Sequence, residues 1–208
     1  MKQIRCILFQ MSEIIQLYDR DGHRLYLTQS ERRAFLEAVK ALPRPQRTFC
    51  TLLHDTGCRI SEALALPGER IDLNGKAAVF ETLKKRRSGV YRAVPLPEAT
   101  LDTLDMVHGL SELQSARRSA ALKQPLWEFS RTTAWRVVKE AMAAAGIADG
   151  PHRTPKGLRH GFGINAILSG VPVTKLQRWM GHAKLETTSI YLDAVGAEER
   201  EIAARMWN

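Results

Sequence analysis

The sequence predicts an α+β fold that is mainly helical and carries a small antiparallel sheet of about three strands. Short alternating segments within residues 71–94 predict the sheet, and Asn74-Gly75 between the first two of them suits a two-residue hairpin turn. Apolar residues at helical spacing predict helices over most of the remaining chain. At 208 residues the chain can bury a full hydrophobic core, which we expect Trp127 and Trp135 to anchor.

Two parts are predicted along the chain. Residues 1–27 are expected to form a short β-hairpin appendage, because Asp21-Gly22 is a hairpin signal within an alternating segment. Residues 28–208 are expected to form one domain, whose first helix starts at the capping box Thr28-Gln29-Ser30-Glu31 and ends at Pro43. The further predicted elements are a helix ending at Gly57, a helix at 59–66, strands at 71–73, 77–83 and 90–94, and helices at 98–108, 111–123, 130–145, 157–169, 173–180, 186–194 and 197–207.

The composition favours a cytoplasmic protein with a polyanionic partner. Thirty-one Lys and Arg residues against 22 Asp and Glu give a net charge of +9. The three cysteines are odd in number and show no C-x-x-C spacing, which favours reduced thiols over a disulfide framework or a zinc site. No apolar stretch approaches the ~18 residues of a membrane span.

Two arginines, a histidine and a late tyrosine together suit phosphodiester chemistry. Arg59 precedes Arg159 by 100 residues, and His182 and Tyr191 follow in the last quarter of the chain. Two guanidinium groups can pair with both non-bridging oxygens of one phosphate. They can also stabilise the phenolate of a tyrosine, whose pKa of about 10 makes it a poor nucleophile at neutral pH. A histidine adds a hydrogen bond, and a lysine can protonate the departing 5′ oxygen.

Each of these residues has a simpler interpretation when taken alone. Tyr191 could be a core or rim residue of a helix, and Arg59 could cap a helix or pair with Glu62. The histidines at positions 152, 160 and 182 lack nearby cysteine or carboxylate ligands at metal spacing, so we expect no metal site. Only the combination of the arginines with the tyrosine favours catalysis.

Several motifs occur in an order that resembles a known family, the tyrosine recombinases or phage integrases. The resemblance to their catalytic domain covers roughly residues 28–195. It is carried by Thr-Gly-x-Arg-x-x-Glu at 56–62, a lysine-rich hairpin ending in Val94-Pro95-Leu96, Thr154 to Phe162 with Leu158-Arg159-His160, Gly170-Val171-Pro172 to Gly181-His182, and Thr187-Thr188-x-x-Tyr191. The resemblance implies a mainly helical fold and DNA strand cleavage through a 3′-phosphotyrosine, with neither metal nor other cofactor.

The resemblance also implies a role for individual residues. Arg59 and Arg159 match the two catalytic arginines, His182 the late His/Trp position, and Tyr191 the nucleophile. The general acid would be a hairpin lysine, either Lys84 or Lys85, of which we favour Lys85. The same hairpin run, Lys84, Arg86 and Arg87, is expected to contact DNA.

The chain departs from the family pattern at two places. Lys156 stands where the family usually has a histidine, so it would act electrostatically and not accept a proton while charged. His160 is expected to be a supporting residue. The segment before residue 28 is too short for the usual helical core-binding domain. Either that domain is absent from this piece or the protein is a single-domain form, and Met1 favours the second.

The expected partner is duplex DNA. By resemblance, four protomers would act on two DNA sites, with the C-terminal helix at 197–207 packing onto a neighbouring protomer. Two alternatives stay open beside a recombinase or integrase. One is a catalytically weakened DNA-binding module of the same fold, and the other is a nicking-closing enzyme like a type IB topoisomerase.

Overall fold

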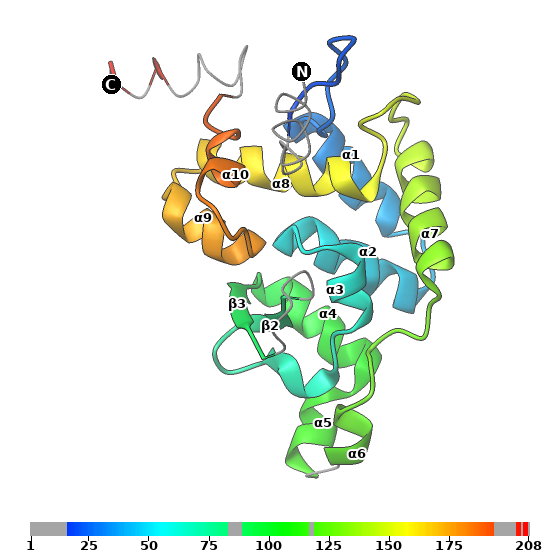
Figure 1. The fold of residues 1–208 in the computed structure, drawn as a ribbon. Helices are drawn as coiled ribbons and strands as arrows, with labels where there is room; N and C mark the ends of the chain where they lie inside the picture. Colours follow the sequence, from blue (N-terminus) through cyan, green and yellow to red (C-terminus); the bar gives the residue numbers. More distant parts are fainter. Residues whose placement is uncertain (1–15, 83–88, 117–118, 194–202, 205, 208) are drawn as a thin grey trace, which may run out of the picture.

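The computed structural model describes residues 16–82, 89–116, 119–193, 203–204 and 206–207. Helix α2 (Arg44–Thr56) lies at its centre and contacts α1 (Gln29–Val39), α3 (Ile60–Leu64), α4 (Glu98–His108) and α8 (Pro155–Leu168). Figure 1 shows α8 crossing above α2, with α7 (Arg131–Ala144) on one side and α9 (Val173–Met180) on the other. The mainly helical fold predicted from the sequence is confirmed.

The first three helices begin and end where local chemistry dictates. Thr28 and Glu31 form the predicted capping box at the start of α1. Pro43 precedes α2, which ends at Gly57 with a φ of 57°. This left-handed conformation lets the chain turn sharply after α2, so that α3 can begin at Ile60 directly after Arg59.

The predicted three-stranded sheet is confirmed. The two-residue turn predicted at Asn74-Gly75 is wrong, because Asp72 pairs with Ala77 and four residues, 73–76, join the first two strands, with Lys76 as the left-handed residue at a φ of 50°. Strands β1 (Ile71–Asp72), β2 (Ala77–Glu81) and β3 (Tyr91–Pro95) are antiparallel and lie in the order β1-β2-β3, after the 3-10 turn η1 (Gly68–Arg70). The loop between β2 and β3, residues 83–88, lies outside the described residues.

The later helices agree with the predicted ranges except at 111–123 and at the end of the chain. Helices α5 (Leu110–Ser115) and α6 (Ser119–Leu122) divide the predicted 111–123 segment. Helix α10 spans only Glu186–Ser189, shorter than the predicted 186–194. Most of the helix predicted at 197–207 lies outside the described residues. Within the described part, every helix falls short of the length and apolarity that a membrane span requires.

The buried side chains form two clusters. The larger one unites the central helices with the sheet and includes Phe49, Phe80 and Trp127. The smaller one lies between α8 and α9, and Tyr191 is one of its members. The prediction that Trp135 anchors the core is wrong, because its side chain is 45% exposed on α7 beneath the ammonium of Lys139.

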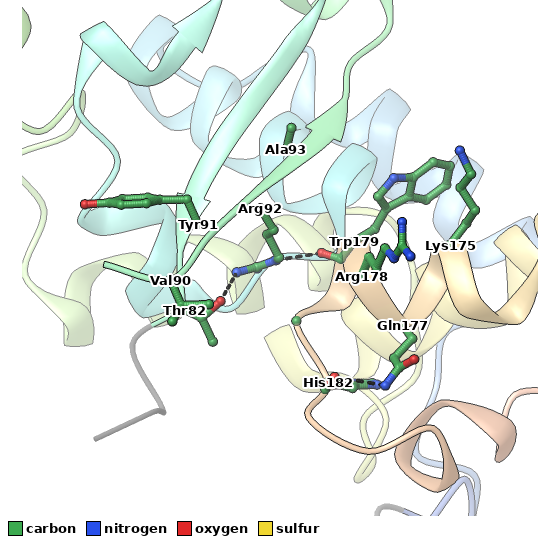
Figure 2. Close-up of a pocket in the computed structure, with 11 residues that line it drawn as sticks. Thr82, Val90, Tyr91, Arg92, Ala93, Lys175, Gln177, Arg178, Trp179 and His182 are labelled. Atoms are coloured by element: carbon green, nitrogen blue, oxygen red, sulfur yellow. Dashed lines mark hydrogen bonds between the residues drawn. The ribbon is translucent and has the colours of Figure 1, made fainter. Parts of the chain in front are cut away.

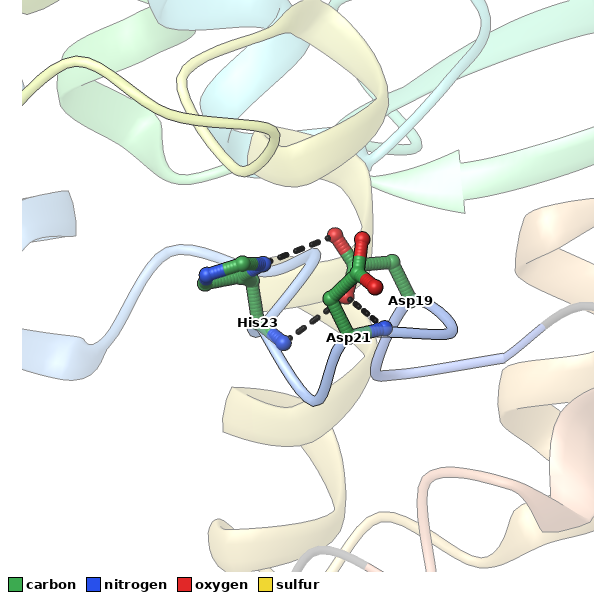
Figure 3. Close-up of side chains that lie close together, drawn as sticks. All are labelled: Asp19, Asp21 and His23. Atoms are coloured by element: carbon green, nitrogen blue, oxygen red, sulfur yellow. Dashed lines mark hydrogen bonds and ion pairs between the residues drawn. The ribbon is translucent and has the colours of Figure 1, made fainter.

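The segment before α1 is folded onto the domain. Its predicted hairpin is reduced to one antiparallel bridge, Tyr18 to Arg24, around the Asp-Gly turn. Figure 3 shows Asp19 closing this turn, where its Oδ1 accepts from the backbone N–H groups of Asp21 and His23. These three residues form a group of potential metal ligands with donor atoms within 4.8 Å, which the turn's own hydrogen bonds account for. Leu17 and Tyr26 belong to the smaller buried cluster. The first 15 residues lie outside the described part.

Candidate active site

Arg59 is held by a carboxylate one helical turn further on. Its Nη1 donates to Oε1 of Glu62 at 2.8 Å, and its backbone N–H donates to Oε2 at 2.8 Å. The pairing with Glu62 that the sequence allowed is therefore present. It fixes the backbone and the guanidinium at the start of α3 and leaves the side chain partly exposed.

Arg159 lies in the second turn of α8 and reaches two other segments. Its Nη1 donates to the carbonyl of Gly57 at 2.6 Å, and its Nη2 donates to the carbonyl of Met180 at 2.6 Å. These bonds join the turn before Arg59 to the end of α9. Burial, reinforced by the nearby charge of Arg59, lowers the pKa of Arg159 to about 10, so the guanidinium stays charged at neutral pH.

Two hydrogen-bonding neighbours fix the tautomer of His182. Nη2 of Arg159 lies 3.1 Å from Nε2 of His182, and the hydroxyl of Thr188 lies 2.9 Å from Nδ1. A guanidinium can only donate, so Nε2 accepts and Nδ1 carries the hydrogen that is donated to Thr188. Burial lowers the pKa of His182 to about 3, aided by the charges of Arg159 and Arg59, so the ring is neutral.

Tyr191 is buried against α8, with only 1% of it exposed. Its hydroxyl lies 3.1 Å from Nδ1 of His160, and its ring stacks at 19° to the ring of His182. A Cβ atom at position 163 would lie 2.6 Å from Cζ of Tyr191, so only glycine allows this approach. The tyrosine therefore packs flat on α8 in a position that a solvent-borne ligand does not reach.

Burial and the nearby positive charges act in opposite directions on the pKa of Tyr191. Burial raises the pKa of Tyr191 to about 12, while Arg159 and Arg59 both favour the phenolate. Burial lowers the pKa of His160 to about 3, with a further contribution from the positive charge of Lys156. A proton transfer from Tyr191 to His160 in this arrangement is strongly unfavourable, so the contact is a neutral hydrogen bond.

The other residues predicted for the site divide into two groups. Lys156 lies exposed in the first turn of α8, one turn before His160. Lys84, Lys85, Arg86 and Arg87 lie in the loop outside the described residues. The structure thus brings together Arg59, Arg159, His182 and Tyr191, and it places Lys156 on the neighbouring turn.

A pocket of about 500 Å³ opens beside His182, between the β2–β3 hairpin and α9 (Figure 2). Lys175 and Arg178 contribute positive charge to its α9 side, and Tyr91 contributes an aromatic ring from β3. Arg92 lies at its base, where it donates to the carbonyl of Trp179 and to the hydroxyl of Thr82. The lining suits a polyanionic backbone, in agreement with the charge balance of the chain.

Sequence reasoning missed Thr188, Gly163 and Arg92. One signal was available for Arg92. Strand β3 alternates between exposed and buried positions, and Arg92 occupies a buried one where an apolar residue is the usual choice. Thr188 was named only within the Thr187-Thr188-x-x-Tyr191 motif, without a role of its own. Gly163 carries no comparable signal, because its contact with Tyr191 joins segments that only the fold brings together.

Comparison with known proteins places the chain in a family. Residues 25–197 match the phage integrase family. The chain belongs to this family. Among its relatives are tyrosine recombinase XerD of Mycobacterium leprae, 32% identical over 201 residues that cover 88% of this chain, and tyrosine recombinase XerA of Pyrococcus furiosus, 28% identical over 86% of it. The chain spans 61% and 60% of the length of these two relatives.

Solved structures show the same fold for this phage integrase domain. The crystal structure of XerA recombinase superposes with a TM-score of 0.70 at 23% identity, covering 87% of this chain and 64% of that one. The catalytic domain of bacteriophage HP1 integrase superposes with a TM-score of 0.61 at 18% identity, covering 86% and 93%. A XerH recombinase bound to its difH substrate gives 0.65 at 20% identity, covering 92% and 60%.

Proposed function

We propose that this chain is a site-specific DNA recombinase or integrase that cleaves and rejoins duplex DNA through Tyr191. The observation that carries the proposal is the cluster of Arg159, His182 and Tyr191, in which the arginine contacts the histidine and the histidine stacks on the tyrosine. The recombinase names of the relatives support the same activity.

In the proposed reaction, Arg59 and Arg159 hold the non-bridging oxygens of one phosphodiester. Three of the five N–H groups of Arg159 point to acceptors among the described residues, which leaves two for a phosphate. The preorganised positive charge then stabilises the negative charge that develops on phosphorus. His182 is neutral and is oriented by Thr188, so its Nε2 holds the Arg159 guanidinium in a fixed position.

The covalent step exchanges one phosphoester for another. Tyr191 Oη bonds to phosphorus as the bond to the 5′ oxygen breaks. The phenolic proton of Tyr191 passes to solvent water, and the 5′ oxygen gains one proton. We assign the latter transfer to Lys85, with Lys84 as the alternative. The phosphotyrosyl ester resembles the broken bond in energy, so rejoining to a second strand requires no ATP. Tyr191 must first leave His160, because its buried hydroxyl does not reach a ligand from that position.

The partners follow from the same proposal. Duplex DNA would lie along the basic pocket beside His182 and the Lys84 to Arg87 loop. Four protomers would act on two sites, with residues 197–207 of each packing onto a neighbour, and the reaction would take place in the cytoplasm. Lys156 would contribute positive charge beside the phosphate.

A nicked-duplex assay tests the proposal. A duplex recovered by binding from a randomised pool is nicked near each candidate phosphate, so that the leaving strand diffuses away and any adduct accumulates. We expect a covalent protein–DNA product that Tyr191→Phe abolishes. Tyr18→Phe, which alters a partly exposed tyrosine near α1, serves as the matched control and retains the product.

The same preparation separates the alternatives. Salt-sensitive DNA binding without an adduct on any nicked duplex would leave only a DNA-binding module and would contradict the proposal. Relaxation of a supercoiled plasmid that carries a single site would indicate a nicking-closing enzyme. Exchange between two site-bearing duplexes is the result that a recombinase predicts.

A further inference from the structure

A buried arginine, Arg92, joins the three elements that surround the candidate site. It is 9% exposed and lies on β3 directly opposite Phe80 of β2, with its guanidinium 5.2 Å from the centre of that ring. An arginine is rarely buried to this degree unless its donors are satisfied. The donors of Arg92 are satisfied by Thr82 directly after β2, by Glu62 of α3 and by Trp179 at the end of α9, and Figure 2 shows the bonds to Thr82 and Trp179.

The first partner of Arg92 is the carboxylate that also holds Arg59. Nη2 of Arg92 donates to Oε2 of Glu62 at 2.6 Å, and Nη1 lies 3.4 Å from Oε1. One buried negative charge is therefore shared by two guanidinium groups. Burial alone would raise the pKa of Glu62, but Arg92 and Arg59 outweigh this effect and lower it, so the carboxylate is charged. With Arg92 present, Arg59, Glu62 and Arg92 together carry one positive charge. Without it, Arg59 and Glu62 would cancel.

The second partner is the end of α9. Nε of Arg92 donates to the carbonyl of Trp179 at 2.7 Å, and the next carbonyl, that of Met180, accepts from Arg159. The last carbonyls of a helix lack partners within the helix and carry partial negative charge, which two cations complement here. Gly181 follows with a φ of +64°, and a Cβ atom there would lie 3.2 Å from the Arg92 guanidinium. Arg92 therefore packs directly against the turn that presents His182.

We propose that Arg92 is a positioning residue for strand cleavage. It neutralises Glu62 so that Arg59 keeps its charge for the phosphate, and it fixes the turn from Trp179 to His182 against Arg159. This inference rests on the proposed function. Arg92 acts through Arg59 and His182, without itself contacting the phosphate.

The decisive comparison uses two scissile groups. In one nicked duplex the scissile group is a phosphodiester, and in the other it is a methylphosphonate, in which a methyl group replaces one charged oxygen. Arg92→Met is expected to slow single-turnover cleavage of the phosphodiester about 100-fold. The methylphosphonate depends less on the charge of Arg59, so the same variant should slow its cleavage by less than about tenfold. Equal slowing of both substrates would show a purely structural role and would overturn the proposal.

A second variant tests the charge argument within the protein. Adding Glu62→Gln to Arg92→Met removes the carboxylate that would otherwise cancel Arg59, so the double variant should cleave the phosphodiester faster than Arg92→Met alone. A double variant that is no faster contradicts the proposal. Arg136→Met, which breaks an exposed arginine–glutamate pair on α7, is the matched control and should cleave at the unmodified rate. If Arg92→Met does not fold, Arg92→Gln, which keeps hydrogen-bond donors but carries no charge, decides the same question with and without Glu62→Gln.

A readout that needs no cleavage separates this inference from the proposed function. The imidazole ¹⁵N signals of His182 report its bonds to Arg159 and Thr188, and they should shift in Arg92→Met but not in Arg136→Met. If the unmodified protein forms no adduct, the proposed function fails, and these signals decide whether Arg92 positions His182. Unchanged signals in folded Arg92→Met would overturn the positioning role.

Discussion

The hydroxyl of Tyr191 and Nδ1 of His160 lie 3.1 Å apart in a region of the core that solvent barely reaches. The candidate nucleophile is thus stored against the histidine that follows Arg159 in the sequence. Because neither ring carries charge at neutral pH, the contact holds the tyrosine in place without activating it.

This contact predicts a measurable coupling between the two side chains. His160→Phe leaves the buried hydroxyl of Tyr191 without a hydrogen-bond partner. In a Tyr191→Phe background the hydroxyl is absent, so His160→Phe no longer carries that cost. Urea unfolding of the two single variants and the double variant should give a coupling free energy of about 1 kcal/mol. Strictly additive losses would show that the hydrogen bond does not stabilise the folded state.

The effect of Gly163→Ala on the free energy of unfolding should change sign when Tyr191 is replaced by alanine. Gly163→Ala places a methyl group 2.6 Å from the tyrosine ring and should lower the free energy of unfolding by roughly 1–3 kcal/mol. In a Tyr191→Ala background the clash is gone, so the same change should raise stability by about 1 kcal/mol through helix propensity. Thermal unfolding of the four proteins measures both effects. Destabilisation of similar size in the two backgrounds would contradict the packing described here.

The buried histidines predict a loss of stability in mild acid. The pKa of His160 and that of His182 are each lowered to about 3 in the folded protein, against about 6.5 when unfolded. Between these values the unfolded chain binds more protons, so stability is full above pH 6.5 and falls as the pH drops. Each histidine should contribute up to about 1.4 kcal/mol per pH unit within that window. Urea unfolding at pH 6.5 and 5.5 should show a smaller loss for His182→Gln than for the unmodified protein, and an equal loss would refute the assignment.

Thr188 predicts a catalytic effect without contact to DNA. Thr188→Val removes the acceptor for Nδ1–H of His182 and leaves a buried donor unsatisfied, at a cost of about 1–3 kcal/mol. If that cost is expressed in the transition state, cleavage of a nicked duplex should slow by about tenfold or more. Thr187→Val changes the neighbouring, less buried threonine and is the matched control. If both variants cleave at the same rate, the orientation of His182 by Thr188 does not contribute to catalysis.

Local signals in the sequence were sufficient for much of the fold. The capping box at Thr28 and Glu31 and the left-handed Gly57 each act within a few residues, so their outcome could be predicted. The two-residue turn at Asn74-Gly75 could not, because the pairing of Asp72 with Ala77 leaves four residues, 73–76, between the strands. Trp135 could not be placed, because whether a helical face meets the core depends on which helices pack against it. Its neighbour Lys139 covers the exposed ring instead.

The candidate site shows the same division. The arginine, histidine and tyrosine positions could be predicted from residue types in order along the chain, and the structure brings Arg59, Arg159, His182 and Tyr191 together. The burial of Tyr191 and the bridging role of Arg92 could not be predicted from the sequence. Both depend on contacts between segments that lie far apart along the chain.

Tyr191 is the residue that we propose forms the covalent bond to DNA. Mass spectrometry of the protein–DNA adduct after protease and nuclease digestion tests it most directly, because it identifies the modified side chain and the end to which it is joined. We expect a nucleotide joined through its 3′ phosphate to the peptide that contains Tyr191. A 5′ linkage, attachment to another residue, or no adduct on any nicked duplex that the protein binds would contradict it.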